Sequence, residues 1–551
     1  MTPPSTPTSP LLEVRNLTIG FGQMSVVRDV SFDLQAGEIL GIVGESGSGK
    51  SMTCRALMGL LPGAAQSTGS IRFKGHELLA ADDSQWRSIR GRDMAMIFQN
   101  PASHLDPLRR VGQQVAAPMV RHLGIDGREA LGRAIRLLDE VGIHDAPERA
   151  RSYPHQFSGG MKQRAMIAAA IACGPKLLLA DEPTTALDVT VQARILRLLK
   201  DLNGNRGLAM IFVSHDLGVI ADICSQVVVM REGEVVERGA VREIIDRPQH
   251  AYTRQLINSQ PARRSFSVSP KEKAGAALLK VEGLSVSFPS RKALGFRRSE
   301  DFIALQDIDL EIGAGETVGI VGESGSGKST LARAVTLQNQ PNAGAIFLDG
   351  KNVDTFGRRE VAAFRRRVQM VFQNPYGSLN PRMTAAEAVA EPIWRHGLAD
   401  RRSAKIQAEE LLEMVELPTG LGNRKPHQLS GGQCQRIGLA RALALKPELL
   451  IADEITSALD VTTQAQILDL LIRLQKERSL ALLYISHDLH VVGSLCQRVY
   501  VFKGGRVVES GPARQVLGSP RAAYTQELVG SLTQFATPVP AQSFEGAHNA
   551  S

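Results

Sequence analysis

An internal repeat constrains this sequence more than any other feature. Residues 42–51 read IVGESGSGKS, and the same ten residues return at 320–329. Four shorter matches follow in the same order: FQNP at 98–101 and 372–375, SGG at 158–160 and 430–432, ADE at 180–182 and 452–454, and SHD at 214–216 and 486–488. A period of roughly 270 residues is far too long for a solenoid unit, which repeats every ~20–50 residues. The repeat therefore predicts a duplicated domain.

The matches divide the 551 residues into two domains. We expect the first at 11–258 and the second at 278–532, because the similar runs LLEV and LLKV open the two copies. The segment between them, 259–277, is polar, contains two prolines and lacks an apolar period, which is typical of a flexible linker. Residues 1–10 and 533–551 have the composition of disordered tails.

Composition and charge exclude several classes of protein. Hydrophobic residues make up 43% and charged residues 22% of the chain, as in soluble globular proteins, and no run approaches the ~20 apolar residues needed to cross a bilayer. The five cysteines form no CxxC pair, so we expect neither a zinc site nor a disulfide framework. The net charge of +8 is spread along the chain, which favours a solvated surface over a patch that binds nucleic acid or an anionic membrane. Charge alone does not decide between these, and we expect no nucleic acid partner. These features predict a cytosolic chain that reaches a membrane only through partners.

Short, wholly apolar runs indicate an α/β fold. Residues 39–43, 177–180 and 210–213 suit strands of a parallel sheet buried on both faces. Helical patterns separate such runs, for example at 130–141 and 191–202, and β-rich segments precede the first apolar strand. Strands and helices that alternate in this way define the class.

The repeated glycine-rich segment predicts a phosphate-binding loop in each copy. A GxxxxGK[ST] sequence between a strand and a helix lets backbone N–H groups surround phosphates at a helix N-terminus. We expect Lys50 and Lys328 to reach the terminal phosphates of ATP, and Ser51 and Ser329 to ligate Mg²⁺. The predicted nucleotide-binding residues are Gly44, Gly47, Gly49, Lys50, Ser51 and Met52, with Gly322, Gly325, Gly327, Lys328, Ser329 and Thr330 in the second copy.

Each copy also contains an apolar strand that ends in two acids. Asp181 and Asp453 end these strands, and we expect them to hold the magnesium shell. Glu182 and Glu454 follow directly, and we expect each to polarise the attacking water as a general base. The sequence therefore predicts Mg²⁺-dependent ATP hydrolysis in both copies.

The segment LSGGQ at 429–433 resembles the signature of the ABC ATPases, and it lies between Gln373 and Asp453 in the order typical of that family. The resemblance implies two tandem P-loop (RecA-like) nucleotide-binding domains, each with a β-rich subdomain and a helical signature subdomain. The signature residues that it implies are Ser158, Gly159, Gly160, Ser430, Gly431, Gly432 and Gln433.

The same resemblance implies that the two domains close head to tail on ATP. Lys50 would then lie opposite Ser430, and Lys328 opposite Ser158, so that each ATP is held by both copies. Both serines begin helical stretches, a position that turns the hydroxyl and the first amides of the helix towards an anion.

Further site residues follow from the resemblance. Each copy has a Q-loop glutamine that senses magnesium and contacts membrane subunits, a switch histidine that contacts the γ-phosphate, a D-loop, and an aromatic residue that stacks on adenine. These are Gln99, His215, 186–188 and Phe21 in the first copy, and Gln373, His487, 458–460 and Phe288 in the second. A core position is the alternative for both phenylalanines.

Two positions depart from the family pattern. The first signature reads FSGGM at 157–161, which changes its first and last residues, and Ile455 stands where the family has proline after the glutamate. Both SGG segments and both glutamates are retained. We therefore expect two competent sites whose activities need not be equal.

The sequence NPYGSLNPR at 374–382 resembles the segment after the Q-loop in ATPases of oligopeptide, dipeptide and nickel importers. The ends of both copies also resemble that group, with GEVVERG and HAYT in the first and GRVVESG and AYT in the second. The fused arrangement is similar to glutathione-type and microcin/peptide-type importers. The C-terminal cysteine cluster that holds an iron–sulfur centre in some unfused relatives has no counterpart here, so we expect no such centre.

The resemblance implies ATP-driven import with two transmembrane permease subunits and a periplasmic or extracellular substrate-binding protein. It places the chain at the cytoplasmic face of the bacterial inner membrane, and it leaves the substrate open. One alternative is a tandem sugar-importer ATPase, although one copy is often degenerate in that group. The other is a translation factor of the ABC-F kind, which would carry a long, charged, helical linker.

Overall fold

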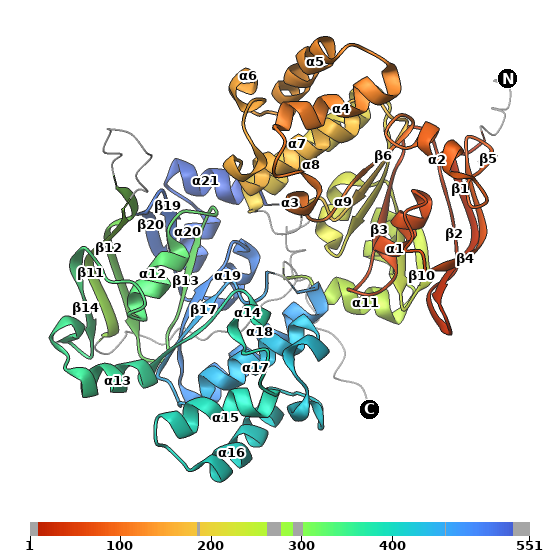
Figure 1. Cartoon of the computed structure of the whole chain (residues 1–551). Helices are drawn as coiled ribbons and strands as arrows, with labels where there is room; N and C mark the ends of the chain where they lie inside the picture. The colour runs from red at the N-terminus through yellow and green to blue at the C-terminus, as the bar shows by residue number, and fades with distance from the viewer. Residues whose placement is uncertain (1–8, 185–187, 262–276, 290–300, 458, 533–551) are drawn as a thin grey trace, which may run out of the picture.

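The computed structural model describes residues 9–184, 188–261, 277–289, 301–457 and 459–532. We call residues 9–261 the first half and residues 277–532 the second half. The two halves have the same construction and lie side by side (Figure 1). Most of the predicted linker, part of each predicted D-loop and the tail from 533 lie outside the described residues.

The first half is built on two sheets. A four-stranded antiparallel sheet has the order β2-β1-β4-β5, and a six-stranded sheet has the order β10-β9-β3-β8-β7-β6, parallel apart from the edge strand β10. The strands are β1 (Leu12–Phe21), β2 (Met24–Leu34), β3 (Ile39–Val43), β4 (Gln66–Phe73), β5 (His76–Glu77), β6 (Met94–Ile97), β7 (Leu177–Asp181), β8 (Ala209–Ser214), β9 (Gln226–Arg231) and β10 (Glu234–Ala240).

Helices cover the six-stranded sheet and form a separate layer between β6 and β7. They are α1 (Lys50–Leu57), α2 (Asp83–Ile89), α3 (Pro101–His104), α4 (Val111–Leu123), α5 (Gly127–Glu140), α6 (Ala146–Arg149), α7 (Gly159–Ile171), α8 (Val189–Arg206), α9 (Leu217–Ile223), α10 (Val241–Asp246) and α11 (Ala251–Asn258), with the short 3₁₀ helix η1 (Pro154–Gln156). Helices α4, α5 and α7 pack together as the helical subdomain.

The second half repeats this order with sheets β12-β11-β14-β15 and β16-β17-β18-β13-β19-β20. Its strands are β11 (Ala277–Phe288), β12 (Phe302–Gly313), β13 (Thr317–Gly322), β14 (Ala343–Leu348), β15 (Lys351–Asn352), β16 (Val368–Val371), β17 (Leu449–Asp453), β18 (Ala481–Ile485), β19 (Arg498–Lys503) and β20 (Arg506–Pro512). Its helices are α12 (Lys328–Val335), α13 (Arg358–Arg367), α14 (Pro375–Ser378), α15 (Ala385–Arg395), α16 (Arg401–Met414), α17 (Gly431–Leu443), α18 (Val461–Arg478), α19 (Leu489–Leu495), α20 (Ala513–Gly518) and α21 (Ala523–Gly530), with η3 (Val353–Thr355), η4 (Leu421–Asn423) and η5 (Pro426–Gln428).

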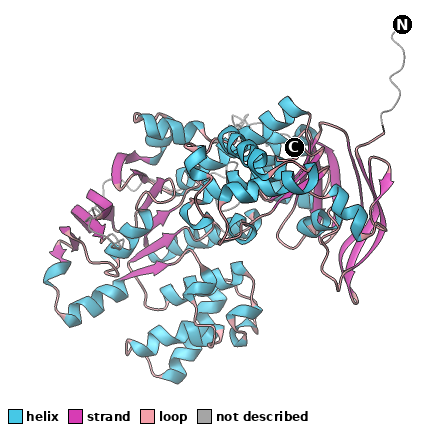
Figure 2. Ribbon diagram, turned by 45° about the horizontal axis from the view of Figure 1, so that its top comes forward, coloured by secondary structure: helices cyan, strands magenta, loops and turns pink. Residues whose placement is uncertain are grey.

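The apolar strands separate two cores in each half. All residues of β3 are buried; Leu40 and Ile42 face the core shared with the antiparallel sheet and α1, whereas Ile39 and Val43 face the core shared with α4, α5, α7 and α8. Because both faces of this strand are buried, polar residues at alternate positions would lie in a core, and the strand is apolar throughout. Figure 2 shows the strands, in magenta, towards the two ends of the molecule and helices of both halves between them.

The parallel order brings the carboxyl ends of β3, β6, β7 and β8 to one edge of the sheet. Open α/β sheets bind ligands at this edge, because loops diverge there and helix N-termini point towards it. Every predicted site residue of the first half other than Phe21 and the signature lies at the end of one of these four strands or in the segment that follows it. The fold therefore places the predicted chemistry at one edge.

The α/β class and the predicted strands and helices are confirmed, with helix ends that differ by a few residues. The pattern at 191–202 becomes α8, which begins at Val189 because the carboxylate of Asp188 accepts a hydrogen bond from the amide of Val191 (2.9 Å). Helix α5 begins before the predicted 130–141 because Asp126 caps it in the same way. Among the described residues, no helix combines the length and apolar character that a membrane crossing requires.

Candidate functional site

The glycine-rich loop connects β3 to α1 and packs closely against the end of β9. Gly47 and Gly49 have φ of 84° and 97°, in the left-handed region that favours glycine. A Cβ atom on Gly44 would lie only 2.2 Å from the carbonyl oxygen of Met230, so only glycine fits at this position. The second loop repeats these constraints, with a Cβ on Gly322 only 2.2 Å from the carbonyl oxygen of Phe502.

The lysine of each loop is buried at the first turn of the following helix. Lys50 is 5% exposed, and its ammonium donates to the carbonyl oxygens of Gly44 (2.7 Å) and Glu45 (2.7 Å). Lys328 makes the equivalent bonds at 2.8 and 2.9 Å. Burial lowers the pKa of Lys50, while the nearby carboxylates, Glu182 first among them, oppose this shift. A buried cation beside curled backbone amides is suited to bind a polyphosphate.

A hydroxyl and a carboxylate meet beside each lysine. Ser51 donates a hydrogen bond to Asp181 at 2.9 Å, and Ser329 donates one to Asp453 at 3.1 Å. Burial raises the pKa of Asp181, and the adjacent Glu182 also raises it, against the hydrogen bond from Ser51. A hydroxyl oxygen and a carboxylate oxygen in contact fit the preference of Mg²⁺ for hard oxygen ligands.

The glutamate after β7 has a strained backbone that directs its side chain. Glu182 has φ of 48°, as does Glu454, and residues other than glycine persist in this region when surrounding contacts hold them there. The amide of Glu182 donates to Val213 in β8 (3.1 Å), which supplies one such contact. Strain of this kind gathers at functional sites.

Two predicted site residues converge on each of these glutamates. Gln99 donates to Glu182 at 2.8 Å, and Nδ1 of His215 lies 3.6 Å from its other carboxylate oxygen. In the second half, Gln373 donates to Glu454 at 2.8 Å and His487 lies 3.8 Å from it. The fold therefore brings together side chains that follow β6, β7 and β8.

Charge around the histidine favours its protonated form. Burial lowers the pKa of His215, but the carboxylate of Glu182, 3.6 Å away, outweighs burial and raises the pKa overall. Conversely, burial raises the pKa of Glu454, but the nearby imidazole of His487 and the charge of Lys328 outweigh burial and lower the pKa. The glutamate of the second half is thus kept ionised, as a residue that orients or deprotonates water must be.

The signature serines cap helices α7 and α17. The Ser158 hydroxyl accepts a hydrogen bond from the amide of Met161 (3.3 Å), and Ser430 accepts one from Gln433 (3.3 Å). Both serines are exposed. The side-chain oxygen of Gln433 also accepts a bond from the amide of Ser430 (2.9 Å), which completes a capping box that methionine cannot form.

The two departures from the family pattern have simple physical accounts. Phe157 and Leu429 occupy the same apolar position and are 5% and 6% exposed, so either side chain fills it. Ile455 is 2% exposed and takes the buried place of Pro183, and the preceding glutamate has the same φ in both halves. Neither change alters the backbone of the residues beside it.

The halves touch through the segments that follow the predicted D-loops. The hydroxyl of Thr462 lies 2.7 Å from Glu45 in the first glycine-rich loop and 2.7 Å from Asp460 of its own half. The hydroxyl of Thr190 lies 3.0 Å from Glu323 in the second loop and 2.8 Å from Asp188. Each threonine can therefore donate its single proton across the boundary or to the aspartate of its own half. The charge of Asp460 also acts on Lys50 across this boundary. Sequence reasoning missed these contacts, although the repeated DVT at 188–190 and 460–462 was an available signal.

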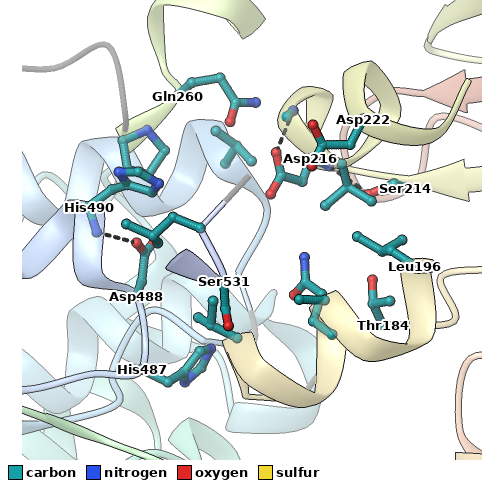
Figure 3. A pocket seen from close by; sticks show the side chains of 18 of the residues that line it. Thr184, Leu196, Ser214, Asp216, Asp222, Gln260, His487, Asp488, His490 and Ser531 are labelled. Carbon is teal, nitrogen blue, oxygen red and sulfur yellow. Dashed lines mark hydrogen bonds between the residues drawn. The ribbon is translucent and has the colours of Figure 1, made fainter. Parts of the chain in front are cut away.

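A cavity of about 400 Å³ lies between the halves near both histidines. Figure 3 shows Asp216, Gln260 and Thr184 of the first half facing Asp488, His490 and Ser531 of the second. Asp216 and Asp488 repel each other across it, and burial raises the pKa of Asp216. Residues from both switch-histidine segments, His215 and His487 among them, therefore line one cavity.

The aromatic residues predicted to stack on adenine lie at the ends of β1 and β11. Phe21 is half-buried and Phe288 is 39% exposed, so neither is a fully buried core residue. Both assignments stay predictions, as do the ligand-contacting roles of the other predicted site residues, among them Met52, Thr330, Gly159 and Gly431.

This arrangement of loop, acids, glutamine, histidine and signature defines a class of ATP-hydrolysing protein. The chain belongs to the ABC transporter family, whose model, described as "ABC transporter", matches residues 27–185 and 305–457. Its two halves are ABC ATPase units, which bind and hydrolyse ATP. A second model, described as "Oligopeptide/dipeptide transporter, C-terminal region", matches residues 236–275.

Similar proteins share the fused arrangement over nearly their whole length. The chain is 44% identical to the peptidoglycan transport ATP-binding protein YejF of Agrobacterium fabrum, over 96% of this chain and 97% of the relative. It is 43% identical to the glutathione import ATP-binding protein GsiA of Salmonella typhimurium, over 95% and 89%. It is also 43% identical to an uncharacterized ABC transporter ATP-binding protein YejF of Escherichia coli, over 95% and 99%.

Proposed function

We propose that this chain is the ATPase subunit of an importer for peptides or related small solutes, such as glutathione. The observation that carries the proposal is the pair of equivalent sites, in which Ser51 bonds to Asp181 and Glu182 gathers Gln99 and His215. A degenerate copy would have lost some of these contacts, whereas the second half retains each of them.

The side chains of each half have separate roles in the proposed hydrolysis. Lys50 leaves the loop carbonyls to neutralise the terminal phosphates, and the loop amides bind the remaining phosphate oxygens. Ser51, Asp181 and Gln99 in one half, and Ser329, Asp453 and Gln373 in the other, would hold a Mg²⁺ ion, which when bound would supply positive charge at the phosphate oxygens.

Glu182 and Glu454 act as general bases that orient and activate the attacking water. His215 and His487 hold the glutamates and contact the γ-phosphate. A raised pKa of the histidine favours a donated hydrogen bond to the glutamate or to the phosphate oxygens.

Both ATP molecules are proposed to lie between the halves, with Lys50 facing Ser430 and Lys328 facing Ser158. The contacts of Thr462 with Glu45 and of Thr190 with Glu323 support this head-to-tail arrangement, because each joins one half to the glycine-rich loop of the other. The exposed N-terminus of α17 adds a partial positive charge to such a site.

The substrate class rests on the relatives and on the C-terminal region. The printed names of the relatives refer to peptidoglycan transport and glutathione import, and residues 236–275 match a region of oligopeptide and dipeptide transporters. A sugar importer or a translation factor is not favoured by these matches. We therefore propose small peptides and peptide-like thiols as the first solutes to test.

The proposed assembly contains two permease subunits and a separate substrate-binding protein outside the membrane. The chain would lie at the cytoplasmic face of the inner membrane, with ABC domains at 11–258 and 278–532, and it would need no nucleic acid partner. The Q-loop segments after Gln99 and Gln373 would contact the permeases.

A transport assay tests the proposal. Cells that lack the gene should lose uptake of labelled glutathione or of a labelled peptide, and wild-type chain should restore it while the Glu182→Gln, Glu454→Gln double variant should not. Uptake of a sugar serves as the control. Loss of sugar uptake with intact peptide and glutathione uptake would contradict the proposed substrate class.

A further inference from the structure

The last helix of each half contacts the glycine-rich loop of the same half through a tyrosine. The hydroxyl of Tyr252 in α11 accepts a hydrogen bond from the amide of Glu45 at 2.9 Å. The hydroxyl of Tyr524 in α21 accepts one from the amide of Glu323 at 3.1 Å. Both halves make this contact, so it belongs to the repeated fold and is not a peculiarity of one loop.

The tyrosine rings are held firmly in place. Tyr252 is 2% exposed and the guanidinium of Arg231 lies 5.2 Å from its ring centre; Tyr524 is 6% exposed and the ammonium of Lys503 lies 4.4 Å from its ring centre. Cations over aromatic faces stabilise such packing. Burial raises the pKa of each tyrosine to about 12, so that the hydroxyl is neutral at physiological pH and able to accept a bond.

A glutamate in the preceding strand fixes the start of each last helix. Glu237 in β10 accepts hydrogen bonds from the amides of Gln249 (2.8 Å) and His250 (3.1 Å). Glu509 in β20 accepts them from Arg521 (3.0 Å) and from the following residue (3.0 Å). The GxVVExG and AYT segments thus act together. The glutamate of the first segment holds the start of the last helix, and the tyrosine of the second segment bonds to the glycine-rich loop.

The loop glutamate that the tyrosine holds is also the one that reaches the other half. The amide of Glu45 bonds to Tyr252, while its carboxylate accepts the bond from Thr462 of the second half at 2.7 Å. Glu323 repeats this between Tyr524 and Thr190, at 3.0 Å to the threonine. When the threonine donates its proton to the loop glutamate and not to the aspartate two residues before it, a continuous path of hydrogen bonds joins each C-terminal helix to the opposite half through the ATP loop.

We propose that Tyr252 and Tyr524 are positioning residues, each holding its loop glutamate in the orientation that bonds to the opposite half. The C-terminal helix thereby sets how readily the two halves close on ATP. This inference rests on the proposed ATPase function. It assigns a role at the ATP site to the region that matches the oligopeptide/dipeptide transporter C-terminal model.

The test measures steady-state ATP hydrolysis by the full chain. Tyr252→Phe and Tyr524→Phe each remove one hydroxyl, and each should lower kcat by about twofold to tenfold, the effect of one hydrogen bond, with a smaller change in KM for ATP. Tyr500→Phe is the matched control, since the Tyr500 hydroxyl also accepts a bond from a backbone amide, but from Glu311 in β12 (3.3 Å) and not from a residue of a glycine-rich loop. Its kcat should match the wild type.

Double variants separate positioning from a general loss of stability. Tyr252→Phe and Thr462→Val act on the same glutamate, so the pair should be no slower than the slower single variant. Tyr252→Phe with Thr190→Val acts on two different glutamates, so the effects should multiply. If the tyrosine only stabilised the fold, its effect on kcat would combine in the same way with Thr462→Val and with Thr190→Val.

Three outcomes overturn the inference. Tyrosine variants that match Tyr500→Phe in kcat and KM would exclude it while leaving the ATPase function intact. Multiplying effects with both threonines would exclude the proposed path. A wild-type chain that hydrolyses no ATP would instead remove the proposed function, and this inference with it.

Discussion

The side-chain amide of Gln99 donates a hydrogen bond to the carboxylate of Glu182 over 2.8 Å, and Gln373 does the same to Glu454. Gln99 follows β6 and leads into α3, whereas Glu182 follows β7. A movement of the segment after β6 therefore changes the position of Glu182 directly. This bond gives the proposed permease contact a short physical route to the proposed base.

Replacing Glu182 or Glu454 by glutamine tests the proposed base. Glutamine keeps the shape and removes the charge, so phosphate release by the assembled transporter should fall by at least ~10-fold for each variant. Glu448→Gln is a suitable control. Glu448 directly precedes β17 and Glu454 directly follows it, but the carboxylate of Glu448 pairs with Arg367 at 2.6 Å. A Glu454→Gln variant that turns over like Glu448→Gln would rule that glutamate out.

The Ile455→Pro variant tests whether isoleucine in place of proline after Glu454 affects ATP turnover. Glu182 and Glu454 have the same φ of 48°, one before proline and one before isoleucine, so the proline should be accepted without a backbone change. Turnover should stay within about twofold of the wild type, as expected for a compatible position. A tenfold change measured in the same assay, with Pro183→Ile as the reciprocal variant, would mean that the two halves differ at this point.

The capping box at Ser430 should contribute to stability. Gln433→Met removes the bond from its side chain to the amide of Ser430, at a cost of about 0.5–1 kcal/mol, and the melting temperature of the full chain should fall. Met161→Gln supplies the missing partner in the first half and should raise it. Gln433→Glu retains the acceptor and serves as control. Equal melting for Gln433→Met and Gln433→Glu would contradict the account.

Low pH should weaken the anchor of the C-terminal helix. Burial acts to raise the pKa of Glu237, but its hydrogen bonds, including those from the amides of Gln249 and His250, lower it below the ordinary value. A carboxylate with a lowered folded pKa stabilises the fold above its unfolded pKa of about 4.3, and this contribution is lost as pH falls through the folded value. The melting difference between wild type and Glu237→Gln should therefore shrink as pH falls from about 7 to about 3. A difference that is constant over this range would contradict the assignment.

Much of the fold followed from local sequence. The apolar runs of β3, β7 and β8 and the loop between β3 and α1 each have a pattern that few structures satisfy. The contacts of Thr462 and Tyr252 with Glu45 did not follow, because they join residues 417 and 207 positions apart and neither side chain belongs to a local period. The roles of Phe21 and Phe288 stay open for a different reason, since exposure alone does not define a partner.

The number of ATP molecules trapped by the full chain tests the central claim most directly. In the Glu182→Gln, Glu454→Gln background, which should bind ATP without hydrolysing it, adding Lys50→Ala and Ser430→Ala damages one proposed site and should leave one ATP per chain. Adding Lys50→Ala and Ser158→Ala damages both proposed sites and should leave none. One trapped ATP in the second variant and none in the first would show that lysine and serine act within the same half, and would contradict the shared sites.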